Sequence, residues 1–197
     1  TSIWGTSSSN LYLGNQWGKI IHWDGEKATD VGIDADDLIA DIRGFSENEI
    51  YAVAGTEVSF DRDQLYYFDG NTWQVIKEAD TFPNNELLAK PLLSVYGRNS
   101  KDLYLAGRRI YRRINDQWLE EGNFNTIHQK IRGRNSNNIV VVGNQSTIYH
   151  YNGVDWLKLE PTGNTNIKFN SVFVTQRKMF VVGRNSSIAF IYVGENF

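Results

Sequence analysis

A short sequence pattern recurs five times along the chain and constrains its fold more than any other feature. Each unit opens with an aliphatic residue, a large side chain and, in four of the five units, a glycine. These openings are Ile3-Trp4-Gly5, Ile42-Arg43-Gly44, Val95-Tyr96-Gly97, Ile131-Arg132-Gly133 and Val172-Phe173-Val174. A second apolar run that ends in glycine follows each opening. The third residues of the openings lie at positions 5, 44, 97, 133 and 174, an average spacing of about 42 residues, which indicates a tandem repeat.

After its second glycine, each unit continues toward a turn and a further strand. Asp-Gly or Asn-Gly follows the third apolar run in three units, at Asp24-Gly25, Asp69-Gly70 and Asn152-Gly153. These dipeptides predict hairpins, because type I′ turns need positive φ at both central residues. A tryptophan begins the expected fourth strand in three units, at Trp73, Trp118 and Trp156. Aromatic residues reach 13% and no stretch sustains a 3.6-residue apolar period, so the chain is predicted to be all-β.

Four strands in about 42 residues is the size of a β-propeller blade. The segments SVYGRNSKDLYLAG and TIYHYNGVDW carry a closer resemblance. They resemble the tandem propeller repeats of many bacterial proteins, in which a Trp-Gly strand, a strand ending Ala-Val-Gly and a His-Trp-Asp-Gly turn before a tryptophan recur. The resemblance covers essentially the whole chain and implies a five-bladed β-propeller. It implies nothing specific about function, since propellers host many unrelated activities.

The expected blades cover residues 1–38, 39–90, 91–126, 127–166 and 167–197 of a single propeller domain. The last unit has no room for a fourth strand before Phe197, so a three-stranded final blade is expected. Because every unit begins with its innermost strand, a ring of five blades closed within the chain is the favoured arrangement. The alternative is an arc of a larger ring.

Histidine is the first candidate for catalysis, and the chain has three. His22 and His150 share a slot of the repeat that holds Tyr67 and Arg112 in other units, which indicates a structural position. His128 is expected in a connection before an inner strand, without a serine or cysteine nearby in sequence that would suggest a catalytic triad.

The acidic residues of the first connection between blades are the second candidate. Propeller glycosidases gather acids from several blades, whereas the equivalent inner-strand positions of this chain are cationic or aromatic. Those positions are Trp4, Arg43, Tyr96, Arg132 and Phe173. The acidic cluster lacks the spacing of a calcium loop, and no phosphate-binding glycine loop occurs. We therefore expect no enzyme activity, no cofactor and no metal site.

The absence of cysteine excludes a disulfide framework and zinc sites built on thiolates. The longest apolar runs, such as Ile139 to Val142, fall far short of the roughly 20 residues that span a bilayer. Nothing at the start resembles a signal peptide, so a cytoplasmic location is expected; the alternative is an exported protein whose leader is missing from this sequence.

Charge is distributed unevenly along the chain. Residues 1–90 hold 16 acids and 6 bases, whereas residues 91–197 hold 7 acids and 14 bases. In a propeller the two sequence halves become spatial halves, so one side should be acidic and the other basic. The sequence pI of about 5.6 argues against a nucleic-acid partner.

We interpret the chain as a non-catalytic propeller that binds another protein through one face. Insertions at residues 57–63 and 81–90 lengthen loops expected on that face, together with exposed aromatic and charged residues. The candidate partner-binding residues are Trp17, Asp34, Asp36, Asp37, Phe60, Asp61, Asp63, Phe82, Arg108 and Arg109. A more specific hypothesis is an inhibitor or immunity protein that neutralises a basic toxin such as a nuclease. The alternative is a carbohydrate-binding, lectin-like propeller, which should repeat its polar contacts in several blades; the corresponding turns of this chain differ.

Overall fold

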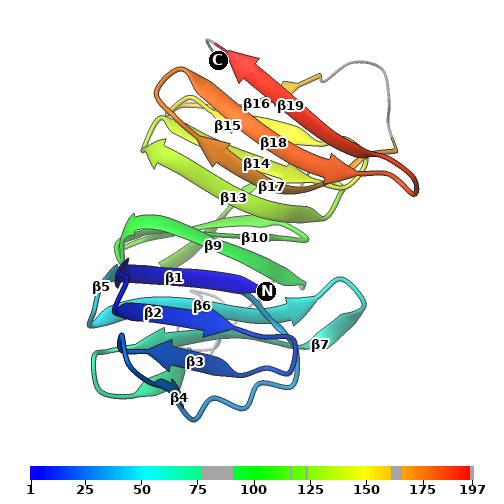
Figure 1. The fold of residues 1–197 in the computed structure, drawn as a ribbon. Coiled ribbons are helices and arrows are strands. Elements are labelled where there is room, and N and C mark those ends of the chain that lie inside the picture. The colour runs from blue at the N-terminus through cyan, green and yellow to red at the C-terminus, as the bar shows by residue number, and fades with distance from the viewer. Residues whose placement is uncertain (77–90, 116, 123, 161–165, 196–197) are drawn as a thin grey trace.

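The computed structural model describes residues 1–76, 91–115, 117–122, 124–160 and 166–195, with only the backbone for residues 59–62. Within these residues the chain forms nineteen strands in five antiparallel sheets, four of them four-stranded and the last three-stranded. The predicted all-β, five-bladed propeller with a three-stranded final blade is confirmed (Figure 1). No helix of the described residues is long and apolar enough to cross a membrane.

Within each blade, consecutive strands pair in sequence order. Blade 1 comprises β1 (Ser2–Ser7), β2 (Asn10–Gly14), β3 (Ile20–Trp23) and β4 (Ala28–Asp30). Blade 2 comprises β5 (Ile39–Ser46), β6 (Glu49–Thr56), β7 (Ser59–Phe68) and β8 (Trp73–Val75). Blade 3 comprises β9 (Leu92–Asn99), β10 (Asp102–Gly107), β11 (Ile110–Ile114) and β12 (Gln117–Gly122). Blade 4 comprises β13 (His128–Asn135), β14 (Asn138–Gly143), β15 (Ile148–Tyr151) and β16 (Trp156–Leu159), and blade 5 comprises β17 (Lys168–Val174), β18 (Lys178–Arg184) and β19 (Ala189–Glu195).

The recurrent glycines lie where neighbouring chain segments approach most closely. A Cβ atom on Gly44, the first glycine of blade 2, would lie 2.3 Å from the ring of Trp4 in blade 1. A Cβ atom on Gly107, the second glycine of blade 3, would lie 1.8 Å from the carbonyl oxygen of Pro91. Both distances are far below van der Waals contact, so the repeat needs glycine at these positions for steric reasons.

The Asp-Gly and Asn-Gly turns differ from the type I′ turns that the sequence predicted. Only the glycine of each pair has positive φ, at 101° in Gly25, 95° in Gly70 and 100° in Gly153. Each turn spans four residues, because Trp23 pairs with Ala28 and Tyr151 with Trp156. The Asp24 side chain satisfies the turn by accepting hydrogen bonds from the N–H groups of Glu26 and Lys27.

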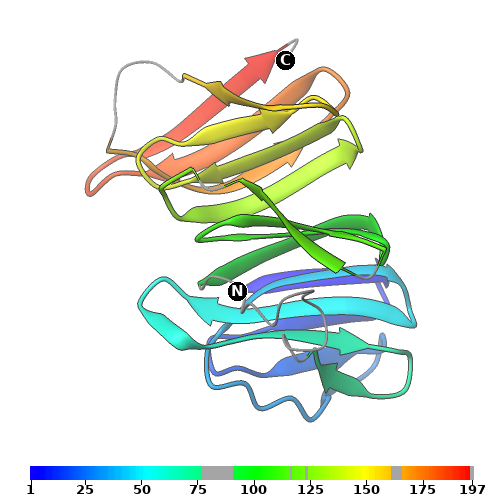
Figure 2. The same cartoon turned by 180° about the vertical axis from the view of Figure 1, so that it is seen from behind.

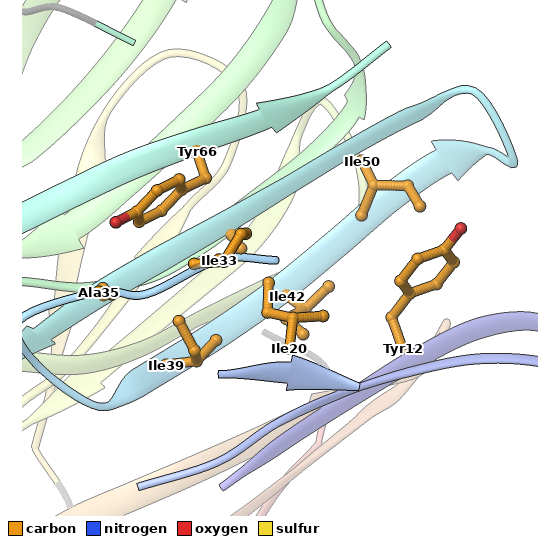
Figure 3. Packing of buried hydrophobic residues seen from close by; sticks show 10 residues of the cluster. Tyr12, Ile20, Ile33, Ala35, Ile39, Ile42, Ile50 and Tyr66 are labelled. Carbon is orange, nitrogen blue, oxygen red and sulfur yellow. The ribbon is translucent and has the colours of Figure 1, made fainter. Parts of the chain in front are cut away.

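The apolar core lies between blades. Figure 3 shows the interface of blades 1 and 2, where buried isoleucines of both sheets pack with Tyr12 and Tyr66. Separate buried clusters fill the three following interfaces, with Tyr51 and Val95, Tyr104 and Ile131, and Val140 and Val172 as members. Face-to-face packing of twisted sheets thus supplies a core at each of the four interfaces.

The closed ring expected from the sequence is not formed. In a closed ring, blade 1 and blade 5 would pack against each other, but here the free sheet face of each of these two blades is exposed. On blade 5, Phe173 is 66% exposed and Ile191 is 75% exposed. On blade 1, Ile3 is 62% exposed, although Ile131 at the equivalent position of blade 4 is fully buried. Figures 1 and 2 show the first and last blades apart at opposite ends of an arc. Closure depends on the angle between successive blades, which no single residue pattern encodes.

Candidate binding face

The loops that follow the second strand of each blade lie beside the connections between blades. Backbone hydrogen bonds join them, from Ala35 N–H to Gly18 O at 3.1 Å and from Asn144 N–H to Ile127 O at 2.9 Å. We call this surface the loop face and define it by residues 15–19, 31–38, 57–58, 108–109, 124–127 and 144–147. The β6–β7 hairpin marks this face at the right of Figure 1. The two kinds of loop therefore share one face, as the sequence predicted.

Trp17 projects from the loop between β2 and β3, and it is 72% exposed. Its backbone is held in place, because Asn15 Oδ1 accepts hydrogen bonds from Trp17 N–H at 2.9 Å and Lys19 N–H at 3.0 Å. The carbonyl oxygen of Asn15 also accepts a hydrogen bond from Ile39 N–H, which anchors the loop to blade 2. An exposed indole thus stands on a well-anchored loop.

The charged residues predicted for this face divide into exposed and engaged side chains. Asp34 and Asp36 are exposed, and Lys19 Nζ lies 3.2 Å from Asp34 Oδ1. Asp37 is half-buried. Arg108 is exposed, whereas Arg109 forms an ion pair with Glu120. Both arginines, together with residues 125–127, line a small cavity of about 190 Å³.

Asp63 is not a surface residue of this face. It lies in β7, is 3% exposed, and accepts a hydrogen bond from Leu92 N–H at 2.5 Å. The expected loop is instead mostly strand, since β7 extends from Ser59 to Phe68. The side chains of Phe60 and Asp61 and the whole of Phe82 lie outside the described residues.

A central cavity of about 390 Å³ opens where the innermost strands of the five blades converge. Residues of blades 2 to 5 line it, including Ala40, Leu93, Lys130 and Ser171, together with Thr1, which directly precedes β1. Glu57, on the loop face of blade 2, reaches across this cavity to Lys168 at the start of blade 5. Its carboxylate also accepts a hydrogen bond from Asn144 Nδ2 of blade 4 at 3.0 Å. Burial opposes ionisation of Glu57, yet these hydrogen bonds outweigh it and lower its pKa.

Asp41 contacts Lys130, which lines this cavity, and joins three blades. Its carboxylate lies 2.7 Å from Arg132 Nη2 and 3.0 Å from Lys130 Nζ, both in blade 4. Ser94 Oγ of blade 3 donates a hydrogen bond to it at 2.6 Å. Burial opposes ionisation of this 1% exposed carboxyl, but Arg132 and Lys130 hold its pKa well below the usual range. The carboxylate is therefore a structural anion at the hub of the blades.

The histidines occupy packed positions. His128 is fully buried at the start of β13, not in a loop as the sequence suggested, and its Nδ1 lies 2.9 Å from Gly107 O. Burial lowers its pKa to about 4, so the neutral ring donates from Nδ1 to this carbonyl oxygen. The ring of His22 stacks on Tyr12 with centroids 4.6 Å apart. Burial also lowers the pKa of His150. No three His, Asp or Glu residues of the described part gather closely enough to hold a metal ion.

A second, larger hollow lies on the outer side of the interface between blades 1 and 2. It encloses about 700 Å³ and is lined by β2, β3, the β4–β5 connection, β7 and β8. We call it the aromatic groove, because Tyr12, Tyr66, Phe68 and Trp73 line it. This groove was not predicted from the sequence. Its only sequence signal is the pair of aromatic residues that flank the Asp69-Gly70 turn.

Comparisons with known proteins support the fold. No family model and no curated protein matches the chain. Among solved structures, YCF48 bound to D1 peptide is similar with a TM-score of 0.68 and 12% identity, over 98% of this chain and 67% of that one. The GH74 enzyme of Niastella koreensis has a TM-score of 0.70 and 14% identity, over 99% of this chain and 35% of that one. The WD40 β-propeller domain of Doa1 has a TM-score of 0.66 and 10% identity, over 99% of this chain and 68% of that one.

These likenesses are low in identity and therefore concern the fold. They include a peptide complex, an enzyme and a WD40 domain, which illustrates how many activities the fold carries. The chain spans about two thirds of the YCF48 and Doa1 chains and about a third of the GH74 chain. By its blades and by these comparisons, the chain has the β-propeller fold.

Proposed function

We propose that the chain is a non-catalytic β-propeller that binds another protein through the loop face. The observation that carries this proposal is Trp17, an indole 72% exposed on a loop that Asn15 anchors at both ends. Exposed tryptophan on a rigid support is typical of interface hot spots, because little conformational entropy is lost on binding. Asp34 and Asp36 next to this loop supply charged groups for the rim of the interface.

The buried and half-buried titratable groups of the inner part of the blades are held in hydrogen bonds and ion pairs, which favours binding over catalysis. Asp41 is held ionised by two cations, and Glu57 is paired with Lys168. His128 is fully buried and donates its Nδ1 proton to a backbone carbonyl. A general acid or base needs a pKa near the working pH and access to substrate, and each of these groups lacks one or both.

A cationic partner suits the acidic half of the molecule. Residues 1–90 of the sequence contain 16 acids and 6 bases, and blades 1 and 2, which fall within this stretch, occupy one end of the arc in Figure 1. Complementary charge accelerates association and excludes partners of like charge. Within this proposal, the chain is an inhibitor or immunity protein that masks a basic toxin such as a nuclease, and it acts in the cytoplasm.

Carbohydrate binding is the second candidate, and the aromatic groove favours it. Gln64 and Asn71 add amide groups to the rings that line this groove. Sugars bind by stacking on aromatic rings and by hydrogen bonds to such amides. The two candidates differ in their dependence on charge, since a neutral sugar is insensitive to salt.

Differential affinity capture tests the proposed function. The wild-type chain, a Trp17→Ala variant and a Val154→Ser variant serve as baits in a lysate of the source organism. Val154 is 79% exposed in a turn between β15 and β16, on the face opposite the loop face, and provides the matched control. We expect a basic protein that the wild type and Val154→Ser retain and that Trp17→Ala loses, and whose toxic activity the pure chain suppresses at equimolar ratio. Identical captured sets for all three baits contradict binding through Trp17.

A further inference from the structure

The aromatic groove is formed by two blades that leave their outer ends uncovered. The outermost strands beside it are short, since β4 and β8 contain three residues each. Tyr12 and His22 line it from blade 1, and Tyr66, Phe68 and Trp73 line it from blade 2. Figure 3 shows Tyr12 and Tyr66 entering this interface from the two blades. The groove volume of about 700 Å³ is sufficient for several side chains of a bound segment.

The rings in the groove pack on one another both face to face and edge to face. Phe68 and Trp73 stack with centroids 5.2 Å apart, and Tyr12 meets Trp73 edge-on at 6.1 Å. Tyr66 donates a hydrogen bond from its hydroxyl to Gln64 Oε1 at 2.6 Å, which fixes its position. Phe68 and Trp73 are only half-buried, so their rings remain accessible from the groove. Tyr12 and Tyr66 are buried, so Phe68 and Trp73 provide the ring surface that can attract a cation through the aromatic quadrupoles.

The charges around these rings are mostly negative. Asp34 lines the groove, with its side chain 82% exposed, and Asp36 lies two residues further along the same connection. Burial, followed by the charges of Asp36 and Asp34, raises the pKa of the Tyr66 hydroxyl. Lys19 Nζ lies 3.2 Å from Asp34 Oδ1 and partly offsets the negative charge of the two carboxylates. This ion pair is half-exposed and therefore contributes little to stability. A positive group entering the groove therefore meets both aromatic rings and carboxylates.

We propose that the aromatic groove receives a lysine or arginine side chain from a basic segment of the protein partner. The rings hold the cation by cation–π attraction, and Asp34 pairs with it at the mouth. The groove reaches the loop face at residues 31–34, so one partner can occupy both surfaces. The inference rests on the proposed function only in taking the partner to be a protein.

Anisotropy of a fluorescein-labelled nonapeptide of alternating arginine and glycine tests this site directly. The matched peptide carries citrulline, which is neutral and nearly the same shape, in place of arginine. We expect the arginine peptide to bind, the citrulline peptide to bind at least tenfold more weakly, and the difference to shrink as salt rises from about 50 to 300 mM. Equal affinity of the two peptides overturns the assignment of a cation.

Two tryptophans at equivalent positions of the repeat provide a matched pair of variants. Trp73 follows the Asp69-Gly70 turn of blade 2 and stacks on Phe68. Trp156 follows the Asn152-Gly153 turn of blade 4, and its ring centroid lies 5.2 Å from that of Tyr151. Trp73→Leu should weaken arginine-peptide binding on the order of tenfold. Trp156→Leu should leave binding unchanged while causing a similar loss of thermal stability. Equal weakening by both variants shows a general effect on the fold and overturns the site.

Two further measurements distinguish a cation site from a carbohydrate site in the aromatic groove. Asp34→Asn should weaken the arginine peptide about threefold at low salt and leave it unchanged at high salt. An uncharged oligosaccharide that displaces the peptide equally well at both salt concentrations assigns the groove to carbohydrate instead. Peptide binding that persists in Trp73→Leu rejects the groove without affecting the proposed function, which depends on Trp17.

Discussion

Arg132 Nη2 lies 2.7 Å from Asp41 Oδ1, although the two residues belong to blades 4 and 2 and are separated by blade 3. Lys130, Ser94 and the N–H group of Val95 also bind this buried carboxylate, so a single anion links three blades at the hub. Removing one partner of a buried ion pair is costly, since the remaining charge loses its compensation. The hub should therefore be more sensitive to substitution than any surface ion pair of the molecule.

Asp41→Asn is expected to destabilise the fold by about 3–5 kcal/mol, because Arg132 and Lys130 are left without their counter-ion. For a chain of this size that corresponds to a loss of roughly 6–20 °C in Tm, measured by circular dichroism. Asp34→Asn, at an exposed carboxyl, is the control and should change the free energy of unfolding by less than about 0.5 kcal/mol. A similar Tm for both variants would show that Asp41 is dispensable.

The same carboxyl predicts acid sensitivity. The pKa of Asp41 is lowered in the folded state, so its contribution to stability is complete above the unfolded pKa of about 3.9 and declines as pH falls below it. Asp41→Asn should therefore lower stability by the full amount at pH 7 and by about 1 kcal/mol less at pH 3, because pH 3 lies about one unit below the unfolded pKa. Urea unfolding of both proteins at the two pH values gives the comparison.

His128 predicts a second pH dependence at higher pH. Its folded pKa of about 4 lies below the unfolded value of about 6.5, so the unfolded state binds the proton more tightly between these values. Stability should fall by about 2 kcal/mol between pH 7 and pH 5 through this residue alone. His128→Asn, which keeps a donor near the carbonyl oxygen of Gly107, should lack this part of the slope. Parallel urea titrations with the same slope in both proteins would contradict the assignment.

The fold was predictable because its signals are local. A glycine such as Gly44 is required by one close contact, and a turn such as Asp24-Gly25 is satisfied by its own side chain. The burial of Asp63 was not predictable, because it depends on the ten-residue length of β7 and on the distant Leu92 N–H. His128 was misplaced for a related reason, since β13 begins earlier than the repeat pattern suggests.

The candidate site was predictable only in part. The exposure of Trp17 and Asp34 follows from their places in connections of a rigid repeat. The aromatic groove arises because β4 and β8 are short, and strand length in the outer part of a blade has little sequence signal. The ion pair between Glu57 and Lys168 was not predictable, because it depends on the curvature of the whole arc, which brings together two residues that are 111 positions apart in sequence.

The exposed face of blade 5 predicts different roles for two adjacent valines. Val182 is 41% exposed on the outer face, whereas Val181 is fully buried against blade 4. Val181→Ala should cost about 2 kcal/mol, from lost apolar burial and the cavity that remains. Val182→Ser should cost less than about 0.5 kcal/mol and should reduce binding of the dye ANS and concentration-dependent association. Equal destabilisation by the two variants would mean that the outer face is covered in solution.

The acidic residues predicted for the partner surface now separate into two classes with different expected effects. Asp34 and Asp36 are exposed on the loop face, so their charges act over distance on an approaching cation. Asp63 is buried and accepts a hydrogen bond from Leu92 N–H, so it stabilises the fold and does not attract a partner from a distance. Steering is screened over about 8 Å at physiological salt, which makes the association rate the quantity that distinguishes the two classes.

The double variant Asp34→Asn, Asp36→Asn should therefore slow association with a cationic partner on the order of tenfold at low salt and flatten the salt dependence, with little change in Tm. Asp63→Asn should do the reverse: it should lower the free energy of unfolding by about 1–2 kcal/mol through the weakened hydrogen bond and leave the association rate nearly unchanged. Biosensor kinetics over a salt series, paired with thermal unfolding, measure both quantities. An association rate unaffected by the double variant would place the partner away from the acidic part of the loop face, because Coulomb attraction must act between the surfaces that meet.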